Sequence, residues 1–180
     1  MKAFIIIFII VLAGCKKDEF NWPVLCSNCS ISVELNGLPW ECKPYSMSLK
    51  IPYTDGDSTF SVVFREVDSK KDSFPDRMIF YNIPYESGNH ILDAQEEQKH
   101  HGISISFNVY EVEYGTPAQT YDVLFDGISF INIEKLDKIT GMVELSFQLN
   151  MKGEYDDWHF TTYPEFLNFT GDVKGEIMFE

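Results

Sequence analysis

The sequence predicts an all-β fold, an antiparallel β-sandwich, with a closed antiparallel barrel of the lipocalin type as the alternative. Apolar and polar residues alternate with a period of two through most of 31–180, as in strands that bury one face. Turn residues, mainly Gly, Pro, Asn and Asp, separate these stretches. We therefore expect roughly nine or ten short strands in a single β domain over 31–180.

The first half of this domain opens with a hairpin. Residues 31–35 alternate, and Asn36-Gly37 is the dipeptide of a tight hairpin turn. Further strands are expected around 47–51 and 60–64. Residues 78–83 are apolar on both faces, which predicts a strand in the centre of a sheet.

The second half contains the clearest alternation and one weak helical pattern. Residues 91–99 have helical spacing, and Asp93 is placed to cap a turn or two of helix. The other segments predict strands at 103–109, 121–125, 128–133, 143–151 and 173–179. Seven phenylalanines fall on the apolar phase and are expected in the core: Phe60, Phe64, Phe80, Phe107, Phe125, Phe147 and Phe160.

Length and charge limit the classes of protein that fit this chain. Its 180 residues leave room for one domain, because domains most often have about 100–150 residues. The chain has 14 Lys and Arg against 28 Asp and Glu, a formal charge of -14. Because phosphate backbones are bound mainly by clustered Lys and Arg, nucleic acid is not expected as a partner.

The N-terminus reads as a lipoprotein signal peptide over 1–14. Ala3 to Ala13 is an unbroken apolar run, about 16 Å long as a helix and too short for a bilayer core of about 30 Å. Its ending, Leu12-Ala13-Gly14-Cys15, resembles the bacterial lipobox. The resemblance implies cleavage before Cys15 and acylation of that cysteine, which would anchor the protein in a membrane. The alternative is an ordinary signal peptide that is cut at another small residue.

The residues that follow Cys15 indicate where in the cell envelope the protein is expected. Residues 15–30 form a lipidated N-terminus and linker ahead of the β domain. Lys16-Lys17-Asp18-Glu19 resembles the signal that sends some Bacteroidetes lipoproteins to the outer face of the outer membrane. We therefore expect an outer-membrane, lipid-anchored protein. Exposure at the cell surface and a solvated tether facing the periplasm both remain open.

The number of cysteines allows at most one disulfide within the chain. Apart from Cys15, the chain has Cys26, Cys29 and Cys42, an odd number in an oxidising compartment. The Cys26-Ser27-Asn28-Cys29 spacing occurs in redox motifs and zinc half-sites, but no second such pair follows. The favoured interpretation is a structural bridge from Cys26 or Cys29 to Cys42.

Several segments together resemble a family of small uncharacterised Bacteroidetes lipoproteins with one β-rich domain. The opening element of that family is matched by Val33-Glu34-Leu35-Asn36-Gly37-Leu38-Pro39-Trp40, and its proline-led segment by 84–92. A late hairpin over 131–147 and a closing strand over 169–173 extend the resemblance. The family has no established catalytic residues, so the resemblance implies residence in the cell envelope and a non-catalytic role.

Four aromatic residues are candidates for a binding surface: Trp40, Trp158, Tyr110 and Tyr114. Flat aromatic faces stack on sugar rings and anchor protein partners when they point outward. The alternative, which we favour for the tryptophans, is packing of Trp40 under the first hairpin and of Trp158 in the core.

Other chemistry has little support in the sequence. The adjacent His100 and His101 would point to opposite faces of an extended strand, and no catalytic or phosphate-binding motif occurs. We therefore expect no enzyme, no cofactor and no metal site. The leading hypothesis is a lipid-anchored envelope protein with a non-catalytic binding or structural β-sandwich, with a glycan or an envelope protein as partner. The alternative is a barrel that carries a small apolar ligand.

Overall fold

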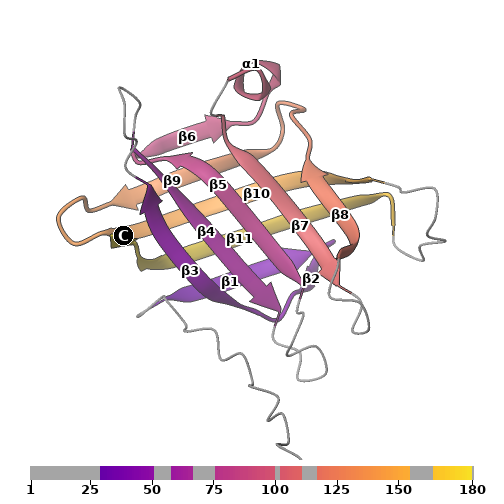
Figure 1. The fold of residues 1–180 in the computed structure, drawn as a ribbon, viewed down its shortest axis with the longest axis horizontal. Helices are drawn as coiled ribbons and strands as arrows, with labels where there is room; N and C mark the ends of the chain where they lie inside the picture. The colour runs from indigo at the N-terminus through magenta and orange to yellow at the C-terminus, as the bar shows by residue number, and fades with distance from the viewer. Residues whose placement is uncertain are drawn as a thin grey trace, which may run out of the picture.

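The structure, a computed structural model, describes residues 29–50, 58–66, 76–99, 102–110, 117–154 and 164–179. Within these ranges the chain forms twelve strands and one short helix (Figure 1). The first elements are β1 (Ser30–Leu35), β2 (Leu38–Pro39), β3 (Cys42–Lys50), β4 (Thr59–Glu66), β5 (Arg77–Pro84), β6 (Gly88–Ile91) and α1 (Ala94–Glu97). The others are β7 (Ser104–Tyr110), β8 (Pro117–Val123), β9 (Phe130–Leu136), β10 (Met142–Glu154), β11 (Phe166–Glu176) and β12 (Met178–Phe179).

All twelve strands belong to one sheet, which is antiparallel except where β12 pairs with β3. Its order is β12-β3-β4-β5-β7-β8-β10-β11-β1-β2, with β9 beside β10 and β6 beside β9. The sheet does not close into a barrel. The prediction of an all-β antiparallel fold is therefore confirmed, and the closed barrel is wrong. No helix in the described part of the chain is long and apolar enough to cross a membrane.

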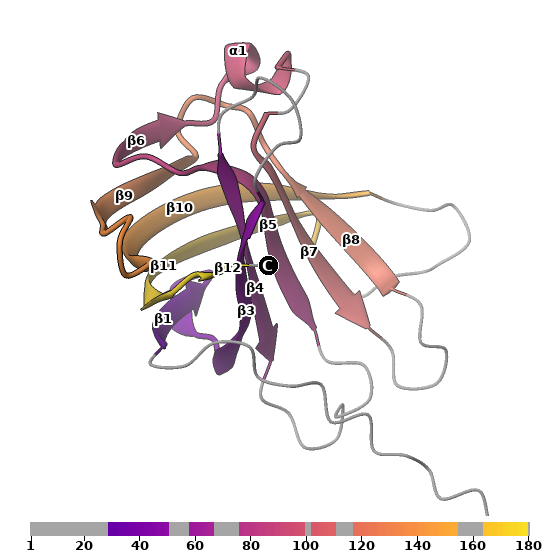
Figure 2. The ribbon, with the colours of Figure 1, turned by 60° about the vertical axis from the view of Figure 1, so that its left-hand side comes forward.

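The long strand β10 joins the two halves of the sheet. On one side it pairs with β11 along most of its length. On the other side its first half pairs with β9, and its last residues, from Met151, pair with β8. The strands β3, β4, β5, β7 and β8 form a front half, and β6, β9, β10, β11 and β1 form a back half that faces it (Figure 2).

Aromatic rings fill the space between the two halves. The ring centroid of Phe147 in β10 lies 5.2 Å from that of Phe80 and 6.2 Å from that of Phe64, and both of these residues belong to the front half. Phe107 of β7 lies 5.0 Å from Phe169 of β11. Such pairs contribute about 0.5–1.5 kcal/mol each beyond the burial of their apolar area. The rings tie the halves together through a packed interior.

Of the seven phenylalanines predicted for the core, the structure describes six, and one of these six, Phe125, is not fully buried. Five of them are buried: Phe60, Phe64, Phe80, Phe107 and Phe147. Phe125 is only half buried and packs against the edge of the core, because it follows the end of β8. Phe160 lies outside the described residues.

The first hairpin matches its sequence signal. Asn36 and Gly37 both have positive φ, 52° and 77°, as a tight hairpin turn requires, and they join β1 to β2. The Asn36 side chain also accepts a hydrogen bond from the backbone N–H of Asn168, which ties the turn to β11.

β5 lies in the centre of the front half, as predicted, but only one of its faces is buried. Met78, Phe80 and Ile83 point into the core, whereas Tyr81 is 48% exposed on the outer face. The prediction of a central strand from apolar residues on both faces is therefore confirmed, although one of those faces is exposed. The sequence did not predict β6, which begins at Gly88 and pairs with β9.

Candidate functional site

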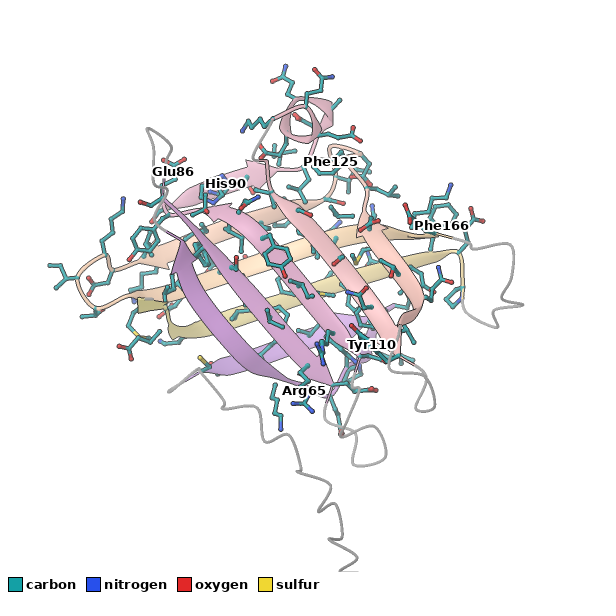
Figure 3. The ribbon with its side chains drawn as sticks, viewed as in Figure 1. Arg65, Glu86, His90, Tyr110, Phe125 and Phe166 are labelled. Carbon is teal, nitrogen blue, oxygen red and sulfur yellow. The ribbon has the colours of Figure 1, made fainter. Side chains whose placement is uncertain are left out.

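The aromatic candidates that the structure describes are held by packing. Trp40 is half buried, and its ring meets Phe107 and Phe169 edge to face at 5.4 and 5.8 Å. Tyr110, at the lower end of β7 in Figure 3, lies under the Arg77 guanidinium at 5.3 Å. Packing of Trp40 beneath the first hairpin is thus confirmed. Trp158 and Tyr114 lie outside the described residues.

The expected bridge to Cys42 is wrong. Cys42 is a free thiol, whereas Cys29 is disulfide-bonded. Both side chains are half buried against the core. Burial raises the pKa of Cys42 from 9.0 to about 12, so this side chain acts as a small apolar group rather than a bonding partner. Cys15 and Cys26, the other cysteines of the chain, lie outside the described residues.

Histidines and carboxylates do not gather into a metal site in the described part of the chain. His90, on β6, is half buried, and its Nε2 atom is enclosed without a hydrogen-bond partner (Figure 3). His100, His101 and His159 lie outside the described residues.

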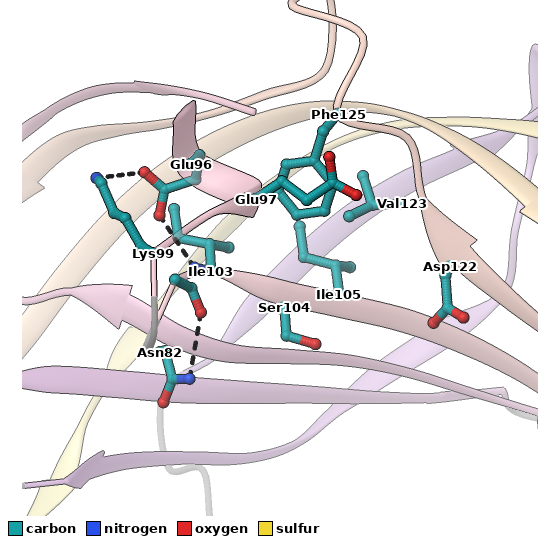
Figure 4. A pocket seen from close by; sticks show the side chains of 11 residues that line it. Asn82, Glu96, Glu97, Lys99, Ile103, Ser104, Ile105, Asp122, Val123 and Phe125 are labelled. Atoms are coloured by element: carbon teal, nitrogen blue, oxygen red, sulfur yellow. Dashed lines mark hydrogen bonds and ion pairs between the residues drawn. The ribbon is translucent and has the colours of Figure 1, made fainter. Parts of the chain in front are cut away.

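A groove of about 380 Å³ opens at the upper end of the front half, beside α1. This volume is near the lower limit of ligand pockets, which usually measure about 300–1,000 Å³. The groove is lined by α1, the bulge of β5, the start of β7 and the end of β8 (Figure 4). Its side chains are those of Asn82, Glu96, Glu97, Lys99, Ile103, Ser104, Ile105, Asp122, Val123 and Phe125, with Gly102.

One wall of the groove is built by α1 and the turn that follows it. Asp93 caps the helix as predicted, accepting hydrogen bonds from the N–H groups of Gln95 and Glu96 at 2.9 and 3.0 Å. The Glu96 carboxylate forms an ion pair with Lys99 and accepts a hydrogen bond from the backbone N–H of Ile103 at 3.0 Å. This carboxylate fastens the helix to the chain that enters β7.

A β-bulge places Asn82 at the groove. Tyr81 and Asn82 both stand opposite Ser61, because Phe60 pairs with Ile83 and Val62 with Phe80. The extra residue is accommodated by Asn82 with φ of 57°, a left-handed conformation that is uncommon for residues other than glycine. The Asn82 amide donates to the carbonyl of Gly102 at 3.2 Å, and this bond ties β5 to the segment before β7.

The groove is amphipathic and carries negative charge. Ile103, Ile105 and Val123 line it with side chains that are buried in the core, and Phe125 lines it with a half-buried ring. At its far end, partial desolvation raises the pKa of Asp122, and the nearby Glu154 carboxylate raises it further. The Lys99 cation is already paired with Glu96, so Glu97 and Asp122 leave an excess of negative charge.

No pattern in the sequence predicted this groove. Asp93 and Phe125 were singled out for capping and packing, and none of the polar residues of the groove was assigned a role. These residues come from β5, α1, β7 and β8, so their proximity depends on strand pairing and not on a local motif. The one local signal is Asn82, a turn-forming residue inside an apolar strand.

Comparisons with protein-family models, with curated proteins and with solved structures find no match to this chain. The resemblance to small Bacteroidetes lipoproteins therefore stays a prediction from the motifs of the sequence.

Proposed function

We propose that this protein is a lipid-anchored envelope protein whose β domain is a binding module, with the groove beside α1 as its binding site. The proposal on the anchor rests on the Leu12-Ala13-Gly14-Cys15 ending of the apolar N-terminal run. The proposal on binding rests on one observation, an open groove in which Glu97, Ser104 and Asp122 have no hydrogen-bond partner in the described part of the chain and lie with the half-buried Phe125. A concave site of this composition is typical of small-molecule recognition.

The architecture supports a site on the outside of the domain. Aromatic contacts between Phe147 and its neighbours on the front half occupy the interior, so a ligand of the barrel type has no support from the fold. The bulge at Asn82 is a second argument, because left-handed residues other than glycine often occur where a strand is adapted to function.

Metabolic labelling tests the anchor. Cells that express the full chain are fed a traceable fatty acid, and the protein is purified and partitioned between detergent and water. We expect label on the wild-type protein and its partition into detergent, and loss of both in Cys15→Ala. A Cys42→Ala variant is the matched control and should keep the label. An unlabelled wild-type protein that retains residues 1–14 would refute the anchor.

Ligand-observed NMR tests the groove. The full mature chain is screened against a mixed set of sugars, amino acids, dipeptides and nucleosides. Ser104→Trp fills the groove with an indole, and Ser32→Trp places the same side chain on an exposed position of β1. We expect at least one class of compound to bind, with binding lost in Ser104→Trp and kept in Ser32→Trp. Equal binding by both variants, or no binding at all, would refute the groove as the site.

Protease treatment of intact cells tests the orientation. If Lys16-Lys17-Asp18-Glu19 directs the protein to the cell surface, added protease should remove it from unbroken cells. A Glu19→Lys variant should then be protected. Protection of the wild-type protein would place the domain in the periplasm.

A further inference from the structure

Several hydrogen-bond acceptors that line the groove have no partner in the described part of the chain. Within the described part of the chain, the carboxylates of Glu97 and Asp122 and the hydroxyl of Ser104 make no hydrogen bond. Asn82 uses its amide N–H on the Gly102 carbonyl and keeps its Oδ1 atom unbonded. A ligand that satisfies this set must bring several donors of its own.

Lys99, the cation that lines the groove in the described part of the chain, is paired with the Glu96 carboxylate, and the N–H of Ile103 donates to that same carboxylate. A ligand that carries a phosphate, a sulfate or a carboxylate would therefore compete with Glu96 for Lys99 and would be repelled by Glu97 and Asp122. An apolar ligand would displace water from these acceptors without replacing its hydrogen bonds, which disfavours its binding.

The apolar side chain of the groove that keeps exposed surface is Phe125, which is half buried and lies in the loop after β8. The neighbouring side chains of Ile105 and Val123 are buried in the core and support this part of the groove from the inner face of the sheet. The face of a sugar ring that carries C–H groups packs on such a surface, while its hydroxyls donate to acceptors around the rim.

We propose that the groove binds a saccharide through its hydroxyl groups, with preference for neutral or amine-bearing sugars over acidic ones. This inference rests on the proposed binding function and adds the chemical class of the ligand. Asp122 and Glu97 accept hydroxyl or ammonium hydrogens, Ser104 and Asn82 offer further acceptor oxygens, and the ring packs on the half-buried Phe125.

An exposed aromatic residue extends this site along the sheet. Tyr81 of β5 stands directly opposite Ser104 of β7, and opposite residues of an antiparallel pair share one face. Its side chain is 48% exposed on the outer face. A second sugar unit that leaves the groove past Ser104 would stack on this ring, so oligosaccharides bind more tightly than monosaccharides.

A printed glycan array probed with the full mature chain tests the ligand class. The protein is kept in a detergent without a sugar headgroup, and the array holds neutral, amine-bearing and acidic glycans. We expect binding to neutral or amine-bearing glycans and none to uronate or sulfate glycans. Absence of binding to every neutral and amine-bearing glycan, or preference for acidic ones, overturns the inference.

Titration calorimetry with variants tests the residues. With the bound glycan, Asp122→Asn should weaken binding about tenfold or more, and the matched control Asp172→Asn, an exposed carboxylate on β11, should bind as wild type. Tyr81→Ala should weaken the oligosaccharide severalfold and leave the monosaccharide unchanged. Equal affinity of Asp122→Asn and Asp172→Asn for the glycan overturns the assignment.

The ligand-observed NMR screen described above, with its Ser104→Trp variant, separates the saccharide inference from the broader proposal that the groove is a binding site. If an amino acid or a dipeptide binds, Ser104→Trp abolishes that binding and no sugar competes, the saccharide inference fails while the groove stands. If nothing binds in a manner sensitive to Ser104→Trp, both fail.

Discussion

Gly102 lies against the backbone of Glu96, so closely that a β-carbon at position 102 would stand 2.5 Å from the Glu96 carbonyl oxygen. The N–H of Gly102 also donates to the carbonyl of Lys99 at 3.1 Å, which closes the turn after α1. The backbone of the short helix α1 can therefore approach position 102 only because glycine has no side chain. This close contact fixes the distance between α1, which forms one wall of the groove, and the chain that enters β7.

Replacement of Gly102 by alanine should displace α1. Because the obstructing atom belongs to the backbone, the helix must shift, and overpacking of this kind costs about 1–3 kcal/mol. Urea unfolding should show this loss in Gly102→Ala, together with loss of ligand binding at the groove. The exposed helix substitution Gln95→Ala is the control and should stay within about 0.5 kcal/mol of wild type. Equal stability of the two variants would contradict the contact.

The aromatic contacts of Phe147 predict a large cost for its removal. Its ring packs against those of Phe64 and Phe80, at the junction of the two halves of the sheet. Phe147→Ala should lower the free energy of unfolding by about 3–5 kcal/mol, as a buried cavity does. Phe166→Ala removes the same ring from a side chain that is 54% exposed and should cost much less. If Phe147→Ala and Phe166→Ala unfold at similar concentrations of denaturant, the conclusion that Phe147 packs in the interior is refuted.

Asp126 should make stability depend on pH below neutrality. Desolvation raises the pKa of this carboxyl, but hydrogen bonds from Asn150 and from the N–H groups of Ser129 and Ile128 outweigh it and lower the pKa below 3.8. Because the pKa of Asp126 is lower in the folded protein than in the unfolded chain, its charge stabilises the fold at pH values above the unfolded-state pKa. This stabilisation is lost as the pH falls through the folded-state pKa.

Unfolding at two pH values tests this dependence. At pH 7, Asp126→Asn should be less stable than wild type by about 1 kcal/mol, because the backbone donors lose a charged acceptor. The difference should shrink at pH 3 and below, where the wild-type carboxyl also becomes protonated. Asp172→Asn, which removes an exposed carboxylate from β11, should show no such difference at pH 7. A constant gap at all pH values would contradict the role of the Asp126 charge.

The Cys42 thiol should be unreactive while the protein is folded. Its pKa is raised from 9.0 to about 12, so the thiolate fraction at pH 8 falls about a thousandfold. Alkylation of this thiol with iodoacetamide should be correspondingly slow in buffer and rapid in guanidinium chloride, as measured by peptide mass spectrometry. The raised pKa also predicts that stability falls as the pH rises from about 9 toward 12. Rapid alkylation of the folded protein would contradict burial of the thiol.

The strands were largely predictable because each one has a local signature. The alternation at 143–151 gave β10, Asn36-Gly37 gave the first turn, and Asp93 gave the start of α1. Errors arose where the deciding interaction was distant in sequence. The bridge expected from Cys26 or Cys29 to Cys42 was wrong, because Cys42 packs as a free thiol.

The candidate site could not be predicted because no segment contains it. Asn82, Glu97, Ser104 and Asp122 are separated by 15, 7 and 18 residues along the chain, and each has an ordinary local setting. They meet because β5, β7 and β8 are neighbours and because the bulge at Asn82 brings its side chain toward Gly102.

The sequence by itself determined that this chain forms pleated strands with one apolar face, since side-chain alternation and turn residues act within a few positions of each other. The tertiary structure alone decided that one open sheet folds over an aromatic core and that a polar groove forms beside α1. The physical reason is that register and the meeting of distant side chains depend on pairing between strands, which no local pattern specifies.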